Sequence, residues 1–194
     1  MSKILEKVVA YQLLSHPNRY NLFSSFQCAY CLGHTETTLL KVVNDLLSAL
    51  DEVKFTVLVL VELWAAFDTV DHDILLHCLH HVFGIQDKVL SGLRLNRFQM
   101  VSIHYTISDP VELCCGVPQG SVLGPILFIL YKQPLSRVIL NHLVSHMLYA
   151  DDTQIYKTCN LNDLASSILC VEKCVSDIKT WMLSNKLQMI EDKT

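Results

Sequence analysis

The order of apolar and polar positions along this 194-residue chain predicts both helices and strands. Apolar residues recur at helical spacing over 4–14, 38–50, 72–83, 122–130 and 161–182. The stretch 55–61 is instead a continuous β-branched and apolar run, which is typical of a buried central strand. Residues 100–105 alternate like a strand, and 111–115 are expected to pair with them. We therefore expect an α+β fold and a single domain.

Apolar stripes predict which side of each helix faces the core. The expected inward residues are Ile4, Val8 and Tyr11 in the first helix, Leu39, Val43, Leu46, Leu47 and Leu50 in the second, and Leu164, Ile168, Val171, Val175 and Ile178 in the last. These stripes are interpreted as core rather than as binding surface. Gly84 is expected to stop the helix over 72–83, and Ser121 to cap the helix that begins near residue 122.

Two adjacent carboxylates, Asp151 and Asp152, lie between two short apolar segments, 146–150 and 153–156. Burying an ionised carboxylate is costly, so such a pair needs compensating positive charge. A hairpin with the pair at its turn would present both carboxylates together, and hard oxygen ligands favour magnesium. The alternative is a solvated Asp-Asp turn.

Two further segments carry candidate chemistry. The apolar run 55–61 ends at Glu62, which the hairpin could bring together with Asp151 and Asp152 around two metal ions. Phosphoryl and nucleotidyl transfer use such an arrangement. In addition, the loop 116–121 leads into a helix, and its backbone amides and that helix N-terminus favour an anionic ligand.

Three segments together resemble a reverse transcriptase of the non-LTR (LINE-type) retrotransposon kind. They are AAFDTVDH at 65–72, GVPQGSVLGPILFILY at 116–131 and YADDTQIY at 149–156. They occur in the family's order, and the resemblance extends from about Ser2 to the last residue. It implies a right-hand polymerase palm, a small antiparallel sheet backed by helices. Partial fingers would occupy 1–55 and the palm 56–194, and the thumb would be missing.

The resemblance implies a metal site and its substrates. Asp151 and Asp152 match the family's acidic pair, and Glu62 stands where the family has its first catalytic Asp. These three residues would hold two Mg²⁺ ions, with Mn²⁺ as a possible substitute. The implied partners are an RNA template, a DNA primer and deoxynucleoside triphosphates.

The resemblance also implies a nucleotide site. Phe67 matches the aromatic residue that lies against the sugar and excludes a 2′-hydroxyl. Gln119 and Gly120 match the loop that contacts the incoming nucleotide and the template base. Lys193 resembles the lysine near the triphosphate.

Several departures from the family pattern indicate a decayed copy with impaired activity. Glu62 adds one methylene to the expected Asp, and a misplacement of about 1 Å can cost on the order of a hundredfold in rate. Trp64 replaces a small residue, so overpacking is expected there. Cys31 stands where the family has an arginine that grips triphosphate, and 91–99 is a few residues short. The alternative is a non-catalytic remnant with weak nucleic-acid or protein binding.

Composition adds two expectations. Hydrophobic residues make up 51% of the chain and the mean hydropathy is +0.33, which predicts exposed apolar patches and poor solubility. A net charge of −4 and a pI near 6.1 do not indicate a basic nucleic-acid surface. The scattered basic residues are interpreted mostly as ordinary solvated surface, with a local basic groove as the alternative: Arg94, Arg97, Lys132, Arg137, Lys157, Lys173, Lys179, Lys186 and Lys193.

The chain shows no amino-terminal secretion signal, so its eight cysteines are expected to be reduced thiols inside the cell, in the nucleus or cytoplasm. The apolar run 122–131 is shorter than the roughly 20 residues that span a bilayer and is interpreted as a buried helix. We expect no membrane partner.

Two zinc-like patterns leave alternatives open. Cys28, Cys31 and His34 could form half a zinc site, with the other half from 114–115 or from Cys170 and Cys174. A second group, His77, His80 and His81, has helical spacing that permits metal binding but is more typical of exposed polar positions.

Overall fold

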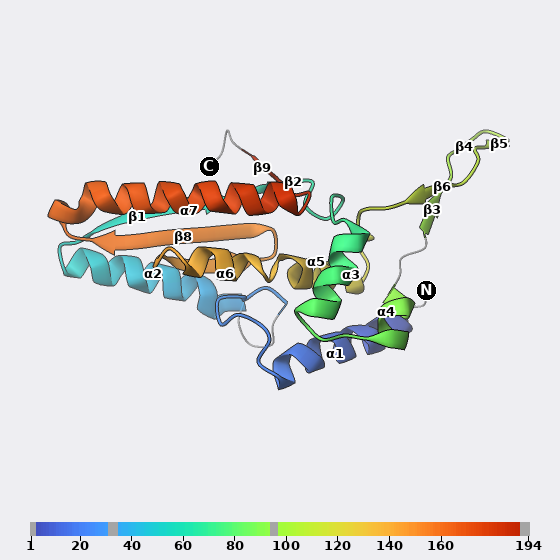
Figure 1. Ribbon diagram of the computed structural model, residues 1–194, viewed down its shortest axis with the longest axis horizontal. Coiled ribbons are helices and arrows are strands. Elements are labelled where there is room, and N and C mark those ends of the chain that lie inside the picture. The colour runs from blue at the N-terminus through green and yellow to red at the C-terminus, as the bar shows by residue number, and fades with distance from the viewer. Residues whose placement is uncertain (1–2, 31–34, 94–96, 191–194) are drawn as a thin grey trace.

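A three-stranded antiparallel sheet forms the centre of the computed structural model, which describes residues 3–30, 35–93 and 97–190 (Figure 1). Its strands are β1 (Phe55–Val61), β7 (Ser145–Tyr149) and β8 (Asp152–Cys159), in the order β1-β8-β7. β7 and β8 are the two arms of a hairpin, and β1 pairs with β8 along its whole length. With helices on both faces of this sheet, the predicted mixture of helix and sheet is confirmed.

β1 is an edge strand, so the prediction of a buried central strand is wrong. Leu58 and Leu60 are 41% and 48% exposed on one face, while Val61 is buried on the other. An apolar run alone cannot distinguish a strand covered on both faces from one whose second face is half open.

Two helices cover the first face of the sheet, the one that carries Val59 and Ile155. They are α6 (Leu135–Leu140) and α7 (Leu164–Ser184), with a 3-10 turn, η1 (Leu161–Asp163), before α7. α5 (Leu123–Lys132) joins them in the main core, and its residues 126–132 are all buried. The main hydrophobic core therefore lies between this face of the sheet and these helices.

The second face is covered by α2 (Thr35–Asp51) (Figure 1), and Leu58 and Leu60 on this face stay partly exposed. Val42 of α2 packs with Cys28, Met147 and Tyr156 in a smaller apolar cluster. The Tyr156 hydroxyl donates a hydrogen bond of 2.5 Å to the carboxylate of Asp45. Because cross-strand partners share a face, Leu58, opposite Tyr156, belongs to the same half-covered surface.

Several predicted core stripes are wrong. In α1 (Lys3–Arg19) the buried residues are Ala10, Leu13 and Pro17, whereas Ile4, Val8 and Tyr11 are at least half exposed. In α2, Val42 and Ala49 are buried, and three predicted core residues are exposed: Val43, Leu47 and Leu50. In α7, Val171 and Ile178 are buried as predicted, but Ile168 is 38% exposed.

These errors have one physical cause. The helices carry apolar residues on more than one side, and contacts with elements distant in sequence decide which side packs. Many of the remaining apolar side chains are exposed on the surface.

The boundaries of α3 and α5 follow the prediction closely. α3 spans His72–His81, two residues short of the predicted end, and is capped by Asp71, which accepts hydrogen bonds from the amides of Asp73 and Ile74. Gly84 follows with φ of +66°. A short helix that the pattern did not predict, α4 (Asp87–Leu93), comes next.

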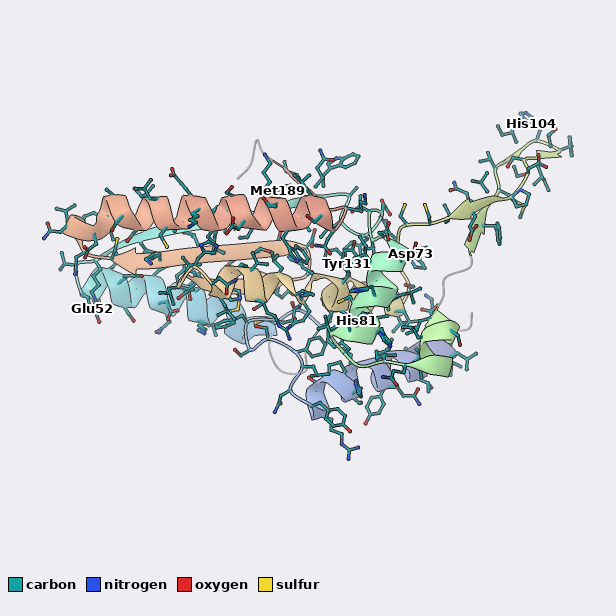
Figure 2. All side chains as sticks on the ribbon, viewed as in Figure 1. Glu52, Asp73, His81, His104, Tyr131 and Met189 are labelled. Carbon is teal, nitrogen blue, oxygen red and sulfur yellow. The ribbon has the colours of Figure 1, made fainter. Side chains whose placement is uncertain are left out.

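A narrow two-stranded arm projects from the body at 97–113 (Figures 1 and 2). β3 (Arg97–Gln99) pairs with β6 (Val111–Leu113), and β4 (Ser102–Ile103) pairs with β5 (Thr106–Ile107). The prediction that 111–115 pairs with 100–105 is therefore wrong, because β6 pairs with β3 and β4 pairs with β5. His104 lies near the far end of the arm in Figure 2.

One apolar stretch, Leu123–Leu140, has the length and mean hydropathy (1.2) of a membrane span. It is divided between α5 and α6, and 67% of it is buried inside the protein. Its apolar character is explained by core packing, in keeping with the buried helix predicted for 122–131.

A buried histidine couples the sheet to α6. His146 of β7 is 1% exposed, and its Nε2 lies 2.8 Å from the Ser136 hydroxyl. Its ring packs 4.3 Å from the ring of Phe26, centroid to centroid. Burial lowers the pKa of His146 from 6.5 to about 4, because the charged form loses its hydration.

Acidification is expected to destabilise the fold through His146. As the pH falls below 6.5, the unfolded chain binds a proton that the folded chain takes up only near pH 4, so the free energy of unfolding decreases over this window. At about 1.4 kcal/mol per pKa unit, the loss approaches about 3 kcal/mol. Urea denaturation across this pH range measures it.

The variant His146→Gln keeps a polar side chain that does not titrate and is the matched control. Its stability should fall less over the same window, while the titration of all other groups is unchanged. The same pH dependence in both chains would contradict the assignment.

Candidate functional site

The two adjacent carboxylates lie at the turn of the β7–β8 hairpin, as predicted. Tyr149 and Asp152 are the last paired residues, and Ala150 and Asp151 form the turn itself. Ala150 has φ of +49°, a conformation that residues other than glycine seldom adopt. Asp151 is half-buried and Asp152 is exposed, so the two acids differ in their access to solvent.

Glu62 lies in the same row of the sheet as this turn. Val61 is paired with Thr153, so the register, continued by one residue, places Glu62 opposite Asp152. The pKa of the Asp152 carboxyl is raised, first by burial and then by the charge of Asp151, with a smaller contribution from Glu62. The three acids therefore repel one another across the end of the sheet.

Lys132 lies beneath the turn, and the interpretation of this lysine as solvated surface is wrong. It is the last residue of α5, its exposed fraction is 0%, and its ammonium donates to the carbonyl oxygens of Ala150, Asp151 and Asp152 at 2.9, 2.7 and 2.8 Å. Burial lowers the pKa of Lys132 to about 7, and the two aspartates oppose that change. A single lysine directly after the apolar run 126–131 is the one sequence signal of this arrangement.

The donor set fits a hard divalent cation in its chemistry. Asp151, Asp152 and Glu62 offer only carboxylate oxygens, and their mutual repulsion would be relieved by a bound cation. Within the described residues, no three His, Cys, Asp or Glu side chains are close enough to form a preassembled metal site. The acids are thus a row of neighbours rather than a closed ligand cage.

The zinc-like patterns divide between described and undescribed residues. Cys31 and His34 lie outside the described residues, and the Cys28 thiol is buried 3.2 Å from the Met147 sulfur. The rings of His77 and His81 lie 4.2 Å apart, centroid to centroid, on α3.

The loop 116–121 is bound to the segment that follows Glu62. The amides of Gly116 and Val117 donate to the carbonyls of Val70 and Phe67, each at 2.8 Å. The Phe67 ring is half-buried and packs 4.8 Å, centroid to centroid, from the ring of Phe128 in α5. These contacts fix the predicted nucleotide loop against the turn segment 65–70, which follows Glu62 in the chain.

The side chain of Gln119 is engaged within the chain. Its Nε2 donates to the two carboxylate oxygens of Asp68 at 3.3 and 3.4 Å. Both residues and the neighbouring Gly120 are exposed, and Gly120 has φ of +74°. The sequence pattern does not predict this pairing of Gln119 with Asp68.

The N-terminus of α5 binds an anion that belongs to the chain itself. The Glu6 carboxylate of α1 accepts a hydrogen bond of 2.8 Å from the amide of Val122. Ser121 also caps this end as predicted, accepting from the amide of Gly124 at 2.8 Å. The Glu6 carboxylate therefore occupies the anion position at the Val122 amide of this helix end.

Trp64 does not overpack the strand, contrary to expectation. It is 60% exposed in β2 (Leu63–Trp64), which pairs with β9 (Gln188–Met189). It lines a cleft of about 750 Å³ together with Lys179 and Lys186. Lys193, the predicted triphosphate lysine, lies outside the described residues.

The amino-terminal part of the chain reaches the site along the outer edge of β7. Leu148 donates to the carbonyl of Phe26 and accepts from the amide of Cys28, at 2.9 and 3.0 Å. Tyr30 follows directly, and its pKa is raised by burial and by the neighbouring Tyr149 and Asp151. A segment more than a hundred residues away in sequence thus completes the wall beside the acidic turn.

The fold places the acidic turn next to Glu62, which directly follows the adjoining strand β1. The family model described as "Reverse transcriptase (RNA-dependent DNA polymerase)" matches residues 1–194, so the chain belongs to this family. Polymerases of this family generally use divalent metal ions.

The relatives identify the kind of reverse transcriptase. The chain is 29% identical over 177 residues to a probable RNA-directed DNA polymerase from transposon X-element of Drosophila melanogaster, covering 87% of this chain and 19% of that protein. It is 30% identical over 163 residues to the RNA-directed DNA polymerase from mobile element jockey of the same fly, covering 80% and 18%. The chain is a partial reverse transcriptase domain of the non-LTR retrotransposon type and spans about a fifth of the length of these relatives.

Solved structures support the same fold. A telomerase from Candida albicans, in complex with a fragment of telomeric RNA, superposes with a TM-score of 0.64 at 13% identity over 96% of this chain and 33% of that one. An apo telomerase from Candida tropicalis gives a TM-score of 0.61 at 14% identity over 95% and 40%.

Gly116→Ala should lower the free energy of unfolding more than the same substitution at a glycine whose Cβ would have free space. At φ of +84° a side chain is strained, and a Cβ would lie 3.1 Å from the carbonyl oxygen of Asp68. We expect a loss of about 2–3 kcal/mol in the free energy of unfolding, from strain of roughly 1–2 kcal/mol plus the close contact.

Gly84→Ala is the matched control, because Gly84 also has positive φ (+66°) but its Cβ would meet nothing within 4 Å. It should lose only about 1 kcal/mol in the same denaturation measurement. Equal losses at both positions would show that the loop is not held tightly against Asp68.

Proposed function

We propose that this chain carries the catalytic centre of an RNA-directed DNA polymerase that works by two-metal nucleotidyl transfer. In this reaction a primer 3′-hydroxyl attacks the α-phosphate of a deoxynucleoside triphosphate, and pyrophosphate leaves. The single observation that carries the proposal is the row of Glu62, Asp152 and Asp151 across the end of the sheet. A bound cation would relieve the repulsion that Asp151 and Glu62 exert on the Asp152 carboxyl, whose pKa is raised first by burial and then by these charges.

Each acid has a defined part in this proposal. Asp151 and Asp152 would hold two magnesium ions together with Glu62, and manganese could replace them. When bound, the ions supply activation of the attacking hydroxyl and neutralisation of the leaving pyrophosphate. Lys132 donates to the backbone carbonyls of the turn, and the carboxylates of Asp151 and Asp152 supply the negatively charged oxygens that a divalent cation prefers.

The nucleotide would lie against the loop 116–121. Phe67, supported from behind by Phe128, would contact the sugar, and Gln119 and Gly120 would contact the nucleotide and template base. Because Gln119 is paired with Asp68, nucleotide binding would have to release or share that hydrogen bond. Lys193 would approach the triphosphate.

In the anatomy of a right-hand polymerase, we assign 1–55 to partial fingers and 56–194 to the palm, with the thumb outside this chain. The cleft beside Trp64, with Lys179 and Lys186, offers positive charge two residues after Glu62, where polyphosphate or a nucleic-acid backbone could pass. The partners would be an RNA template and a DNA primer. The polymerisation reaction would take place inside the cell, in the nucleus or cytoplasm.

A second candidate is a non-catalytic remnant that keeps the fold and weak nucleic-acid or protein binding. The observation that favours it is Glu62, whose longer side chain displaces the carboxylate from where an aspartate would hold it. An impaired enzyme lies between these two possibilities.

Primer extension on an RNA template with magnesium or manganese tests the proposal. If the chain is a polymerase, Asp151→Asn should abolish incorporation, because removing a metal ligand costs far more than the roughly 10- to 100-fold typical of its supporting residues. Glu62→Asp should raise the rate by up to about a hundredfold, because it restores the shorter side chain.

Glu112→Asp makes the same chemical change as Glu62→Asp, but in the projecting arm, and should leave the rate unchanged. Folding of every variant is first established by circular dichroism. Salt-dependent RNA binding without incorporation, even in Glu62→Asp, would favour the remnant over the enzyme.

A further inference from the structure

Lys132 uses all of its hydrogen-bonding capacity on the acidic turn. An ammonium group has three N–H donors and no acceptor. In Lys132 they are directed at three consecutive backbone carbonyls, those of residues 150–152, at 2.7 to 2.9 Å. In the protonated form of Lys132 these hydrogen bonds are charge-assisted, and full burial of the side chain shields them from water.

The turn needs such support from outside the hairpin. Ala150 adopts φ of +49°, which a glycine would accept without strain and an alanine does not. Asp151 and Asp152 also repel each other, which favours any opening of the turn that separates them. The ladder of β7 and β8 ends at Tyr149 and Asp152, so it does not hold the turn itself.

We propose that Lys132 is a positioning residue: its ammonium fixes the backbone of the turn at three points and thereby presents the Asp151 and Asp152 carboxylates as one rigid pair. It touches no reacting atom. Its positive charge lies on the backbone side of the turn and offsets part of the repulsion between the two acids. The consequence for metal binding rests on the proposed function, whereas the effect on the turn does not.

If Lys132 had only a general structural role, its loss would have different consequences. If this lysine merely filled the core, its loss would lower the stability of the whole fold and would leave the turn as protected as the rest. A positioning role loosens the turn locally and changes how tightly the carboxylates bind a cation.

Hydrogen exchange on the full chain separates these roles. Lys132→Met has a similar length but no donor, and the matched control Lys157→Met makes the same change in β8, away from the turn. In Lys132→Met we expect the amides of 150–153 to exchange about tenfold faster or more. The amides of α3 report global opening and should change equally little in both variants.

Manganese binding, followed by electron paramagnetic resonance, tests the consequence. Loss of positive charge alone would strengthen binding of Mn²⁺ to the acids, so weaker binding reports lost positioning. We expect the affinity of Lys132→Met to fall about 10- to 100-fold, and that of Lys157→Met to stay the same.

Unchanged exchange at 150–153 in folded Lys132→Met would overturn the proposal, as would equal or tighter binding of Mn²⁺. If the unaltered chain binds no Mn²⁺, the proposed function fails, and the exchange rates still decide the role of Lys132.

Should Lys132→Met not fold, the unaltered chain supplies the test. The ammonium protons of Lys132, assigned by their absence in Lys132→Arg, should give a slowly exchanging NMR signal at mildly acidic pH. Exchange as fast as that of surface lysines would overturn the proposal.

Discussion

The carboxylates of Asp151 and Asp152 can be held at the end of an apolar hairpin because hydrogen bonds and charge reach the turn from elsewhere in the chain. The buried ammonium of Lys132 engages three carbonyls of the turn and carries the opposite charge. An unpaired charge in this position would be strongly destabilising, whereas this one is fully hydrogen-bonded. The end of α5 and the tip of the hairpin are therefore one structural unit.

The rest of the site is assembled around this unit by pairing rather than by local sequence. The register of β1 on β8 brings Glu62 into the row of the two aspartates. The loop 116–121 is tied by backbone hydrogen bonds to the segment after Glu62, and residues 26–28 bind the outer edge of β7. The result is an acidic turn in which the repulsion on the Asp152 carboxyl is only partly offset, and this supports the proposed metal site.

The sequence predicted the parts whose signals are local. The acidic turn between two apolar segments, the position of Glu62 at a strand end and the cap at Ser121 each depend on residues within a few positions, and the structure contains them. The edge position of β1, the packing sides of α1 and α2, and the carboxylate of Glu6 at α5 depend on residues far away in sequence. Lys132 was misjudged for the same reason, because a lysine's ordinary place is the surface and only the folded neighbour provides its three acceptors.

The central claim is that the row of Glu62, Asp151 and Asp152 is a divalent-metal site. Crystals of the chain soaked in Mn²⁺, with data collected at the manganese absorption edge, test it most directly. The account predicts anomalous density within coordination distance of the Asp151 and Asp152 carboxylates and its loss in Asp151→Asn. Manganese bound only elsewhere, or an equally strong peak in Asp151→Asn, would contradict it.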